Sequence, residues 1–170
     1  MQEIESYKFC PQCGGPLAKR LIKLGEPERL VCTVCGYVFY IDPKLAAIAV
    51  IPLDGGIVMV RRAINPGYGL WVAPGGFVDA GETVEDALVR EALEEVRLHV
   101  RPVKLLGLHS YAQRRTVVVS YLTQYLGGEL AAGDEALEAR IFARSDIPWE
   151  EIAFSSTREA LQRFLKENPG

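Results

Sequence analysis

The sequence predicts an α+β protein in which mixed strands pack with one central and one C-terminal helix, preceded by a small four-cysteine module. All four cysteines lie within the first 35 residues, and the pair Asp42-Pro43 then interrupts the chain before a long apolar run begins. The helical periodicity of an acidic segment places a helix between the strands that follow. We therefore expect a small domain over residues 1–43 and a larger one over residues 44–170.

The composition is that of a globular chain, with 170 residues of which 49% are hydrophobic and 24% charged. A net charge of −3 argues against a nucleic-acid-binding protein, which usually carries an excess of basic residues. The longest apolar run, 45–53, is far shorter than the roughly 18 residues of a membrane span, so no membrane contact is expected. The first residues lack the features of a secretory signal, which predicts a cytoplasmic protein.

The cysteines form two Cys-x2-Cys pairs separated by 18 residues, a spacing typical of a tetrahedral zinc site. The expected ligands are Cys10, Cys13, Cys32 and Cys35. Two disulfides or four free thiols are the alternatives, and a cytoplasmic location argues against disulfides. Four thiolates leave no open position on the metal, so the zinc is expected to be structural. Short strands at 30–31 and 37–40 would flank the second pair, and the module resembles a zinc ribbon.

Apolar runs separated by glycine and proline predict the strands of the larger domain. The run 45–53, the turn Asp54-Gly55-Gly56 and the next run are typical of a hairpin. A short strand at 70–72 is expected to stop at the turn Pro74-Gly75-Gly76. The remaining strands are expected at 57–60, 103–108, 116–125 and 140–143.

Two segments have the apolar spacing of helices. Residues 83–96 place their apolar side chains along one stripe, and Thr83 with Asp86 three residues later is typical of a capping box. The segment 149–167 contains the last helix.

The central helix carries three carboxylates close together. Glu91, Glu94 and Glu95 fall within an arc of about 100° on the helix surface, since each residue advances the helix by about 100°. Such like charges repel one another, and the segment 79–95 contains a single basic residue, Arg90. A divalent cation that prefers oxygen ligands, Mg²⁺ or Mn²⁺, would relieve the repulsion. A solvated acidic helix face is the alternative.

The surrounding residues resemble the Nudix box, the signature of a hydrolase family. Gly76, Glu82 and the run Arg-Glu-Ala-Leu-Glu-Glu at 90–95 match six of its seven fixed positions. Arg97 departs from the pattern, which has glycine there, and this puts the geometry of the helix end in doubt. The resemblance extends from residue 45 to the C-terminal helix. It implies a Nudix α/β/α sandwich with a mixed sheet and hydrolysis of a nucleoside diphosphate linked to another group.

The resemblance also assigns roles to individual residues. Glu91 and Glu95 would be the main ligands of the catalytic Mg²⁺ or Mn²⁺, and Glu94 a further ligand or a partner of metal-bound water. Glu82 would complete the metal shell or orient Arg90, which would hold the carboxylates by salt bridges. The Gly75-Gly76 turn would bring a backbone carbonyl to the metal. From a later acidic loop, Glu135 is expected as a ligand or base, with Glu138 as the second candidate.

A zinc ribbon joined to a Nudix domain resembles the branch with NADH and FAD/ADP-ribose pyrophosphatases. The array SQPWPFPxS of the NADH enzymes is absent from the corresponding segment 109–115, which argues against NADH. The segment 147–156 resembles the FAD/ADP-ribose enzymes, so ADP-ribose or FAD is the favoured substrate and a nucleoside monophosphate the product. The alternatives are an NADH/NAD pyrophosphatase, or a zinc-ribbon binding module with a ligand-sensing Nudix domain.

The small-molecule nucleotide would need aromatic and cationic partners. The candidates are Arg61, Arg62, Tyr68, Tyr111, Arg114 and Arg115. Trp71 is expected in the core, and His109 in a structural role at a strand end. Nudix pyrophosphatases are often homodimers, so a homodimer is the oligomeric state that the resemblance favours.

Overall fold

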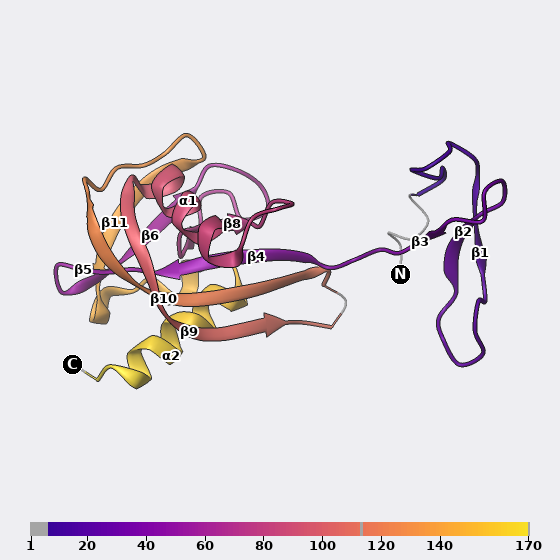
Figure 1. Cartoon of the computed structure of the whole chain (residues 1–170). Coiled ribbons are helices and arrows are strands. Elements are labelled where there is room, and N and C mark those ends of the chain that lie inside the picture. The colour runs from indigo at the N-terminus through magenta and orange to yellow at the C-terminus, as the bar shows by residue number, and fades with distance from the viewer. Residues whose placement is uncertain (1–6, 113, 170) are drawn as a thin grey trace. The chain divides into compact units, whose positions relative to one another are not determined.

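The computed structural model describes residues 7–112 and 114–169 and divides the chain into two compact units, Met1–Pro43 and Lys44–Gly170. The smaller unit is an antiparallel sheet in the order β1-β2-β3 (Figure 1). Its strands are β1 (Leu17–Arg20), β2 (Arg29–Cys32) and β3 (Val38–Phe39). Strand β1 was not expected, because its sequence Leu-Ala-Lys-Arg lacks the apolar alternation of a half-buried strand.

Apolar burial in the smaller unit is slight. Within residues 7–43 the buried residues are Cys10, Leu30 and Cys32, two of which are cysteines. A core of this size contributes too little to hold the unit together, so a crosslink through the cysteines is needed for stability.

The larger unit contains two sheets and two helices. The first sheet has the order β8-β4-β10-β9 and the second the order β11-β6-β5, with β7 paired to β6. Strands β4 and β10 are parallel and the other pairs are antiparallel, so the first sheet is mixed and the second is antiparallel. The elements are β4 (Lys44–Val50), β5 (Pro52–Leu53), β6 (Gly56–Arg62), β7 (Trp71–Val72), β8 (Gly75–Phe77), α1 (Val84–Val96), β9 (Leu98–Ser110), β10 (Thr116–Gly128), β11 (Ala136–Ala143) and α2 (Ser155–Glu167).

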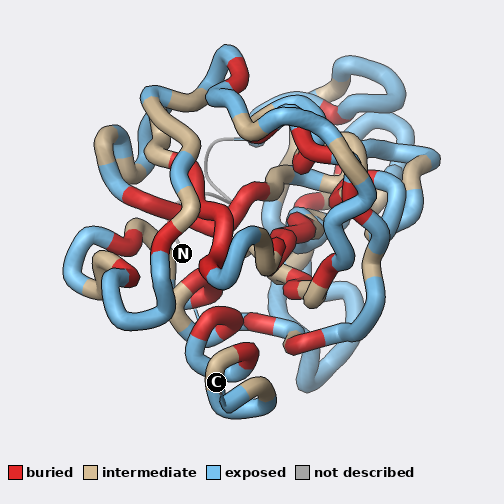
Figure 2. The backbone as a smooth tube through the Cα atoms, turned by 90° about the vertical axis from the view of Figure 1, so that its left-hand side faces the viewer, coloured by how far each residue is buried: buried red, intermediate tan, exposed pale blue. Residues whose placement is uncertain are grey.

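Strand β4 separates two hydrophobic clusters, because successive side chains of a strand point to opposite faces. Ile48 and Val50 belong to the cluster that contains the buried face of α2, whereas Ala47 and Ala49 belong to the one that contains the buried face of α1. The two helices thus cover opposite sides of the strands, and buried residues concentrate between them (Figures 1 and 2). The predicted α+β fold, a sandwich with a mixed sheet, is confirmed.

Two details of the predicted strands were wrong. The run 45–53 is divided between sheets: β4 pairs with β8 and β10, and only Pro52 and Leu53 form the hairpin with β6. Proline cannot donate a ladder hydrogen bond, which fits β5 being an edge strand. Residues 75–77 are the strand β8 rather than a turn. A Cβ atom on Gly75, whose φ is 151°, would lie 2.1 Å from the carbonyl oxygen of Ala47, so the glycine permits this close pairing.

Helix α1 begins and ends at specific residues. The Thr83 hydroxyl accepts a hydrogen bond from the amide of Asp86, as predicted for the capping box. Arg97 adopts the left-handed conformation, with φ at 59°, so the helix ends in the geometry that glycine usually provides. Helix α2 begins at Ser155, after a short 3-10 turn at Trp149–Glu151. In the described part of the chain, no helix is both long and apolar enough to cross a membrane.

Candidate active site and cysteine cluster

The four cysteines converge on one point in the smaller unit. All four sulfur atoms lie within 4.8 Å of one another. Three of the Sγ–Sγ distances are 3.3, 3.5 and 3.8 Å, which is close to the edge of about 3.8 Å that a tetrahedron with Zn–S bonds of about 2.3 Å would have. Backbone N–H groups point at the sulfur atoms: those of Val34 and Cys35 donate to Cys32. This all-sulfur donor set fits a structural zinc ion.

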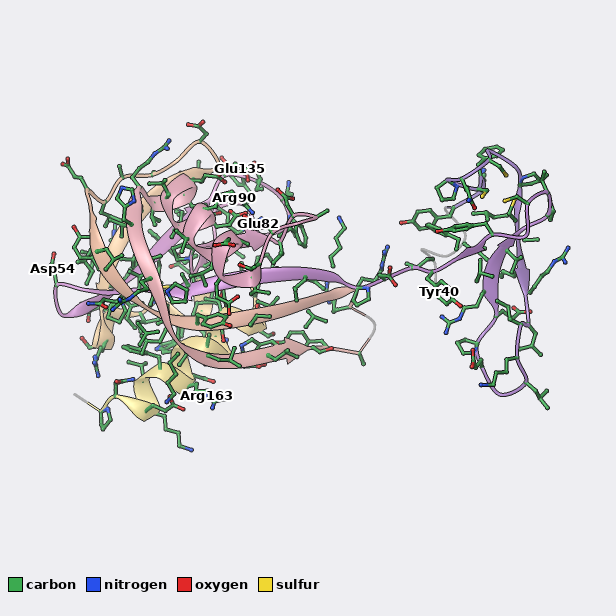
Figure 3. The ribbon with its side chains drawn as sticks, in the orientation of Figure 1. Tyr40, Asp54, Glu82, Arg90, Glu135 and Arg163 are labelled. Carbon is green, nitrogen blue, oxygen red and sulfur yellow. The ribbon has the colours of Figure 1, made fainter. Side chains whose placement is uncertain are left out.

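In the larger unit, Arg90 connects three of the predicted carboxylates. Figure 3 labels Arg90 and Glu82, and the Nε and Nη2 atoms of Arg90 both donate to Glu82 at 2.9 Å. Its Nη1 donates to Glu91 at 2.7 Å and to Glu94 at 3.2 Å. The bidentate contact with Arg90 lowers the pKa of Glu82. The Nη2 atom also donates to the carbonyl of Phe77. Arg90 is therefore fully occupied by protein groups, and its role in orienting the carboxylates stays a prediction.

Glu91 and Glu95 project from α1 onto β8. A Cβ atom on Gly76 would lie 2.3 Å from Glu91 Oε1, and the amide of Gly75 donates to Glu95 Oε2 at 2.8 Å. Burial raises the pKa of Glu91, and it raises the pKa of Glu95 to about 7 despite that hydrogen bond. Burial thus disfavours the charged form of both carboxylates, and a bound cation would offset that cost. Their oxygen atoms fit a hard divalent cation such as Mg²⁺ or Mn²⁺.

The later acidic loop also approaches these carboxylates. The negative charge of Glu135 contributes to the raised pKa of both Glu91 and Glu95. Its segment is fixed in place, because the amide of Gly133 donates to the backbone carbonyl of Glu95 and the carbonyl of Glu135 accepts from Ala63. The second candidate, Glu138, forms a salt bridge with Arg140 on β11 instead. The described contact of Gly75 uses its N–H, so a carbonyl ligand from Gly75 stays a prediction.

The substrate-binding candidates lie in two places. Arg61 and Arg62, at the end of β6, donate through Nε to carbonyls of the loop 63–70, which also carries the exposed Tyr68. The positive charge of Arg62 opposes part of the rise in the pKa of Glu95, so this cation lies close to the carboxylates. Tyr111 instead donates to Glu159 of α2.

The other candidates take structural positions or lie in the 111–115 segment. His109 is buried, with one ring nitrogen 2.9 Å from Ser120 and the other 2.9 Å from Glu159, and Trp71 is buried against Phe142. Both thus take the structural positions expected of them. The Arg114 amide donates to the Tyr111 carbonyl, and the Arg115 carbonyl accepts from Lys44. Gln113 lies outside the described residues.

Sequence reasoning missed Phe154 as a neighbour of the site. Its ring lies under the guanidinium of Arg62, 5.1 Å from Cζ to the ring centroid. The two residues are far apart in the sequence, and the segment around Phe154 carried no signal beyond its family resemblance.

Comparison with known proteins gives matches over both units. The family model of the NUDIX domain matches residues 43–164, and that of the Nudix N-terminal zinc ribbon matches residues 8–41. An ADP-ribose pyrophosphatase from Methanocaldococcus jannaschii is 39% identical over 139 residues, which cover 79% of this chain and 78% of that protein. A NAD-capped RNA hydrolase, NudC, from Stutzerimonas stutzeri is 26% identical, and the match covers 98% of this chain but 59% of that protein. The crystal structure of a NUDIX hydrolase from Nitrosomonas europaea has a TM-score of 0.90 and 31% identity, covering 95% of this chain and 92% of that one.

Proposed function

Because the chain belongs to the Nudix hydrolase family, we propose that it hydrolyses the diphosphate bond of ADP-ribose with the help of Mg²⁺ or Mn²⁺, with FAD as a second substrate. The observation that carries the proposal is the pair of half-buried carboxylates, Glu91 and Glu95, held side by side against β8 with raised pKa values. The similarity to an archaeal ADP-ribose pyrophosphatase supports the choice of substrate.

In the proposed reaction, water adds its oxygen to one phosphorus and the P–O–P bond to the other phosphate breaks. The products are AMP and ribose 5-phosphate, and the protons of water are distributed between the product phosphates and solvent. A divalent cation would neutralise the phosphates and activate the water. Glu91, Glu94 and Glu95 would hold it, with the carbonyl of Gly75 as a candidate fourth ligand.

The neighbouring residues would orient this cluster. Arg90 keeps Glu82, Glu91 and Glu94 in fixed positions through its four contacts with them. We assign Glu135 to the attacking water, as the acceptor of its proton, because this carboxylate approaches both metal-binding glutamates from a separate loop.

The cysteine cluster would bind zinc and stabilise the smaller unit. Sulfur ligands select zinc over magnesium, and the cluster offers no oxygen ligand or open position for catalysis. We propose a structural role for this ion.

A NAD-type substrate is the second candidate, because the chain also matches a NAD-capped RNA hydrolase. NADH and NAD-capped RNA therefore belong in the substrate panel, although the net charge of −3 favours a small nucleotide over RNA.

The test is a panel of ADP-ribose, FAD, NADH and NAD-capped RNA, assayed with Mg²⁺ or Mn²⁺ and with products separated by chromatography. We expect ADP-ribose or FAD to give AMP with the highest kcat/KM. A kcat/KM for NADH or NAD-capped RNA at least about tenfold above both would contradict the proposed substrate. The absence of hydrolysis across a wide set of nucleoside diphosphate derivatives would contradict the proposed reaction.

A further inference from the structure

The side chain of Arg62 is held from three sides. Its Nε donates to the carbonyl of Pro66 at 2.8 Å, and its Cζ lies 5.1 Å from the centroid of the Phe154 ring. Gly67 packs against the same side chain, since a Cβ atom there would lie 3.4 Å from Arg62 Cδ and 3.0 Å from Ala153 Cβ. These contacts restrict the rotamers of a residue that would otherwise be flexible at the end of a strand.

The position of Phe154 is fixed by backbone pairing. Ile152 forms a parallel bridge with Trp71, and the amide of Ala153 donates to the Trp71 carbonyl at 3.0 Å. Trp71 in turn pairs with Arg61 of β6, the residue next to Arg62. The ring of Phe154 also packs against the hydrophobic cluster on the α1 side of the unit. The backbone pairing of Trp71 therefore connects the segment that carries Phe154 to the strand that carries Arg62.

The stacked arginine keeps its binding groups available. The hydrogen bond to Pro66 uses Nε, and among the described residues the two terminal amino groups of Arg62 have no hydrogen-bond partner. Arg62 lies opposite Ala136 in the pairing of β6 with β11, directly beside Glu135 of the candidate site. A planar guanidinium with both amino groups available binds two oxygen atoms of one phosphate at once.

We propose that Phe154 is a positioning residue, which holds the Arg62 guanidinium in the orientation that binds a phosphate group of the diphosphate substrate. The inference rests on the proposed function, because it requires a diphosphate beside the carboxylates. It adds the residue that immediately precedes α2 to those that determine substrate affinity.

The test compares steady-state kinetics of variants with the diphosphate that the wild-type protein hydrolyses best. Phe154→Leu keeps an apolar side chain and removes the stacking ring, so KM should rise about 2- to 5-fold with little change in kcat, as expected for a lost cation–π contact. Phe154→Trp keeps an aromatic ring at this position, so its KM should equal that of the wild type. Arg62→Ala should raise KM by about tenfold or more, since a bidentate charged contact with the phosphate is lost. Adding Phe154→Leu to Arg62→Ala should then have no further effect on KM.

The chain offers a control at the far end of α2, the helix that begins directly after Phe154. Arg144 stacks on Phe164 at 5.6 Å, and Phe164→Leu removes a ring that also supports an arginine but lies in the core, near the other end of α2. It should leave KM unchanged. The unfolding midpoint of every variant is measured, and Phe154→Met replaces Phe154→Leu if the latter does not fold.

Three results would overturn the inference while leaving the proposed hydrolysis intact. The first is a KM for Arg62→Ala equal to that of the wild type. The second is a rise in KM on Phe154→Leu that is the same in the wild type and in Arg62→Ala. The third is a KM for Phe154→Trp as high as that for Phe154→Leu. A wild-type protein that hydrolyses no diphosphate would overturn the proposed function and this inference with it.

Discussion

Replacing Glu95 with glutamine should make the metal-free protein more stable while it removes activity. The Glu95 carboxylate is half-buried beside Glu91 and near Glu135, and its pKa is raised from 4.5 to about 7. Glutamine has the same shape and can still accept the hydrogen bond from the amide of Gly75, but it carries no charge. The variant therefore removes an electrostatic cost of folding and leaves the local contacts in place.

The magnitude follows from the difference in pKa between the folded and unfolded states. A carboxyl group whose pKa is higher in the folded state binds more protons there, so stability falls as pH rises from 4.5 to about 7 and stays low above that. At about 1.4 kcal/mol per pH unit, the free energy of unfolding of the wild-type protein loses up to about 3 kcal/mol over this range. Glu95→Gln should therefore match the wild type near pH 4.5 and exceed it by up to about 3 kcal/mol at pH 8.

Urea unfolding of the metal-free protein, kept so by a chelator and monitored by tryptophan fluorescence, measures this effect. Both tryptophans, Trp71 and Trp149, lie in the larger unit, so the signal reports on the domain that contains Glu95. Glu129→Gln makes the same charge change at an exposed position and should show no pH-dependent gain. Adding Mg²⁺ or Mn²⁺ should stabilise the wild type and have little effect on Glu95→Gln. A variant no more stable than the wild type at pH 8 would refute the reasoning.

Three further predictions concern other parts of the molecule. Glu91→Gln should lower kcat by about 10²- to 10³-fold with no loss of folding, because charge stabilisation at the attacked phosphorus is lost; a mild effect equal to that of Glu129→Gln would contradict a metal-binding role. Purified protein should contain about one zinc ion per chain by metal analysis, and Cys10→Ser should lose it while tryptophan fluorescence shows the larger unit still folded. Gly75→Ala should lower both the unfolding midpoint and activity, because its Cβ would lie 2.1 Å from the carbonyl oxygen of Ala47; an unchanged midpoint would show that β8 adjusts freely.

The parts of the site that sequence analysis predicted are those set by local geometry. Residues three and four apart on a helix share a face, so Glu91, Glu94 and Glu95 could be placed together from their spacing alone. The four cysteines could be grouped for a similar reason, because two tight turns with a short connection supply the ligands of one ion. The left-handed end of α1 shows the limit of such patterns: Arg97 replaces the expected glycine and adopts the same conformation.

The sequence by itself determined the family, the α+β class, the helix that carries the carboxylates and the cysteine cluster, because each depends on residues close together in the chain. Only the tertiary structure decided that Gly75 donates to Glu95, that Glu135 rather than Glu138 approaches the carboxylates, and that Phe154 supports Arg62. These contacts join residues 20 to 92 positions apart and depend on which strands pair. Strand pairing is determined by the burial of whole faces against the two helices, and no local periodicity encodes it.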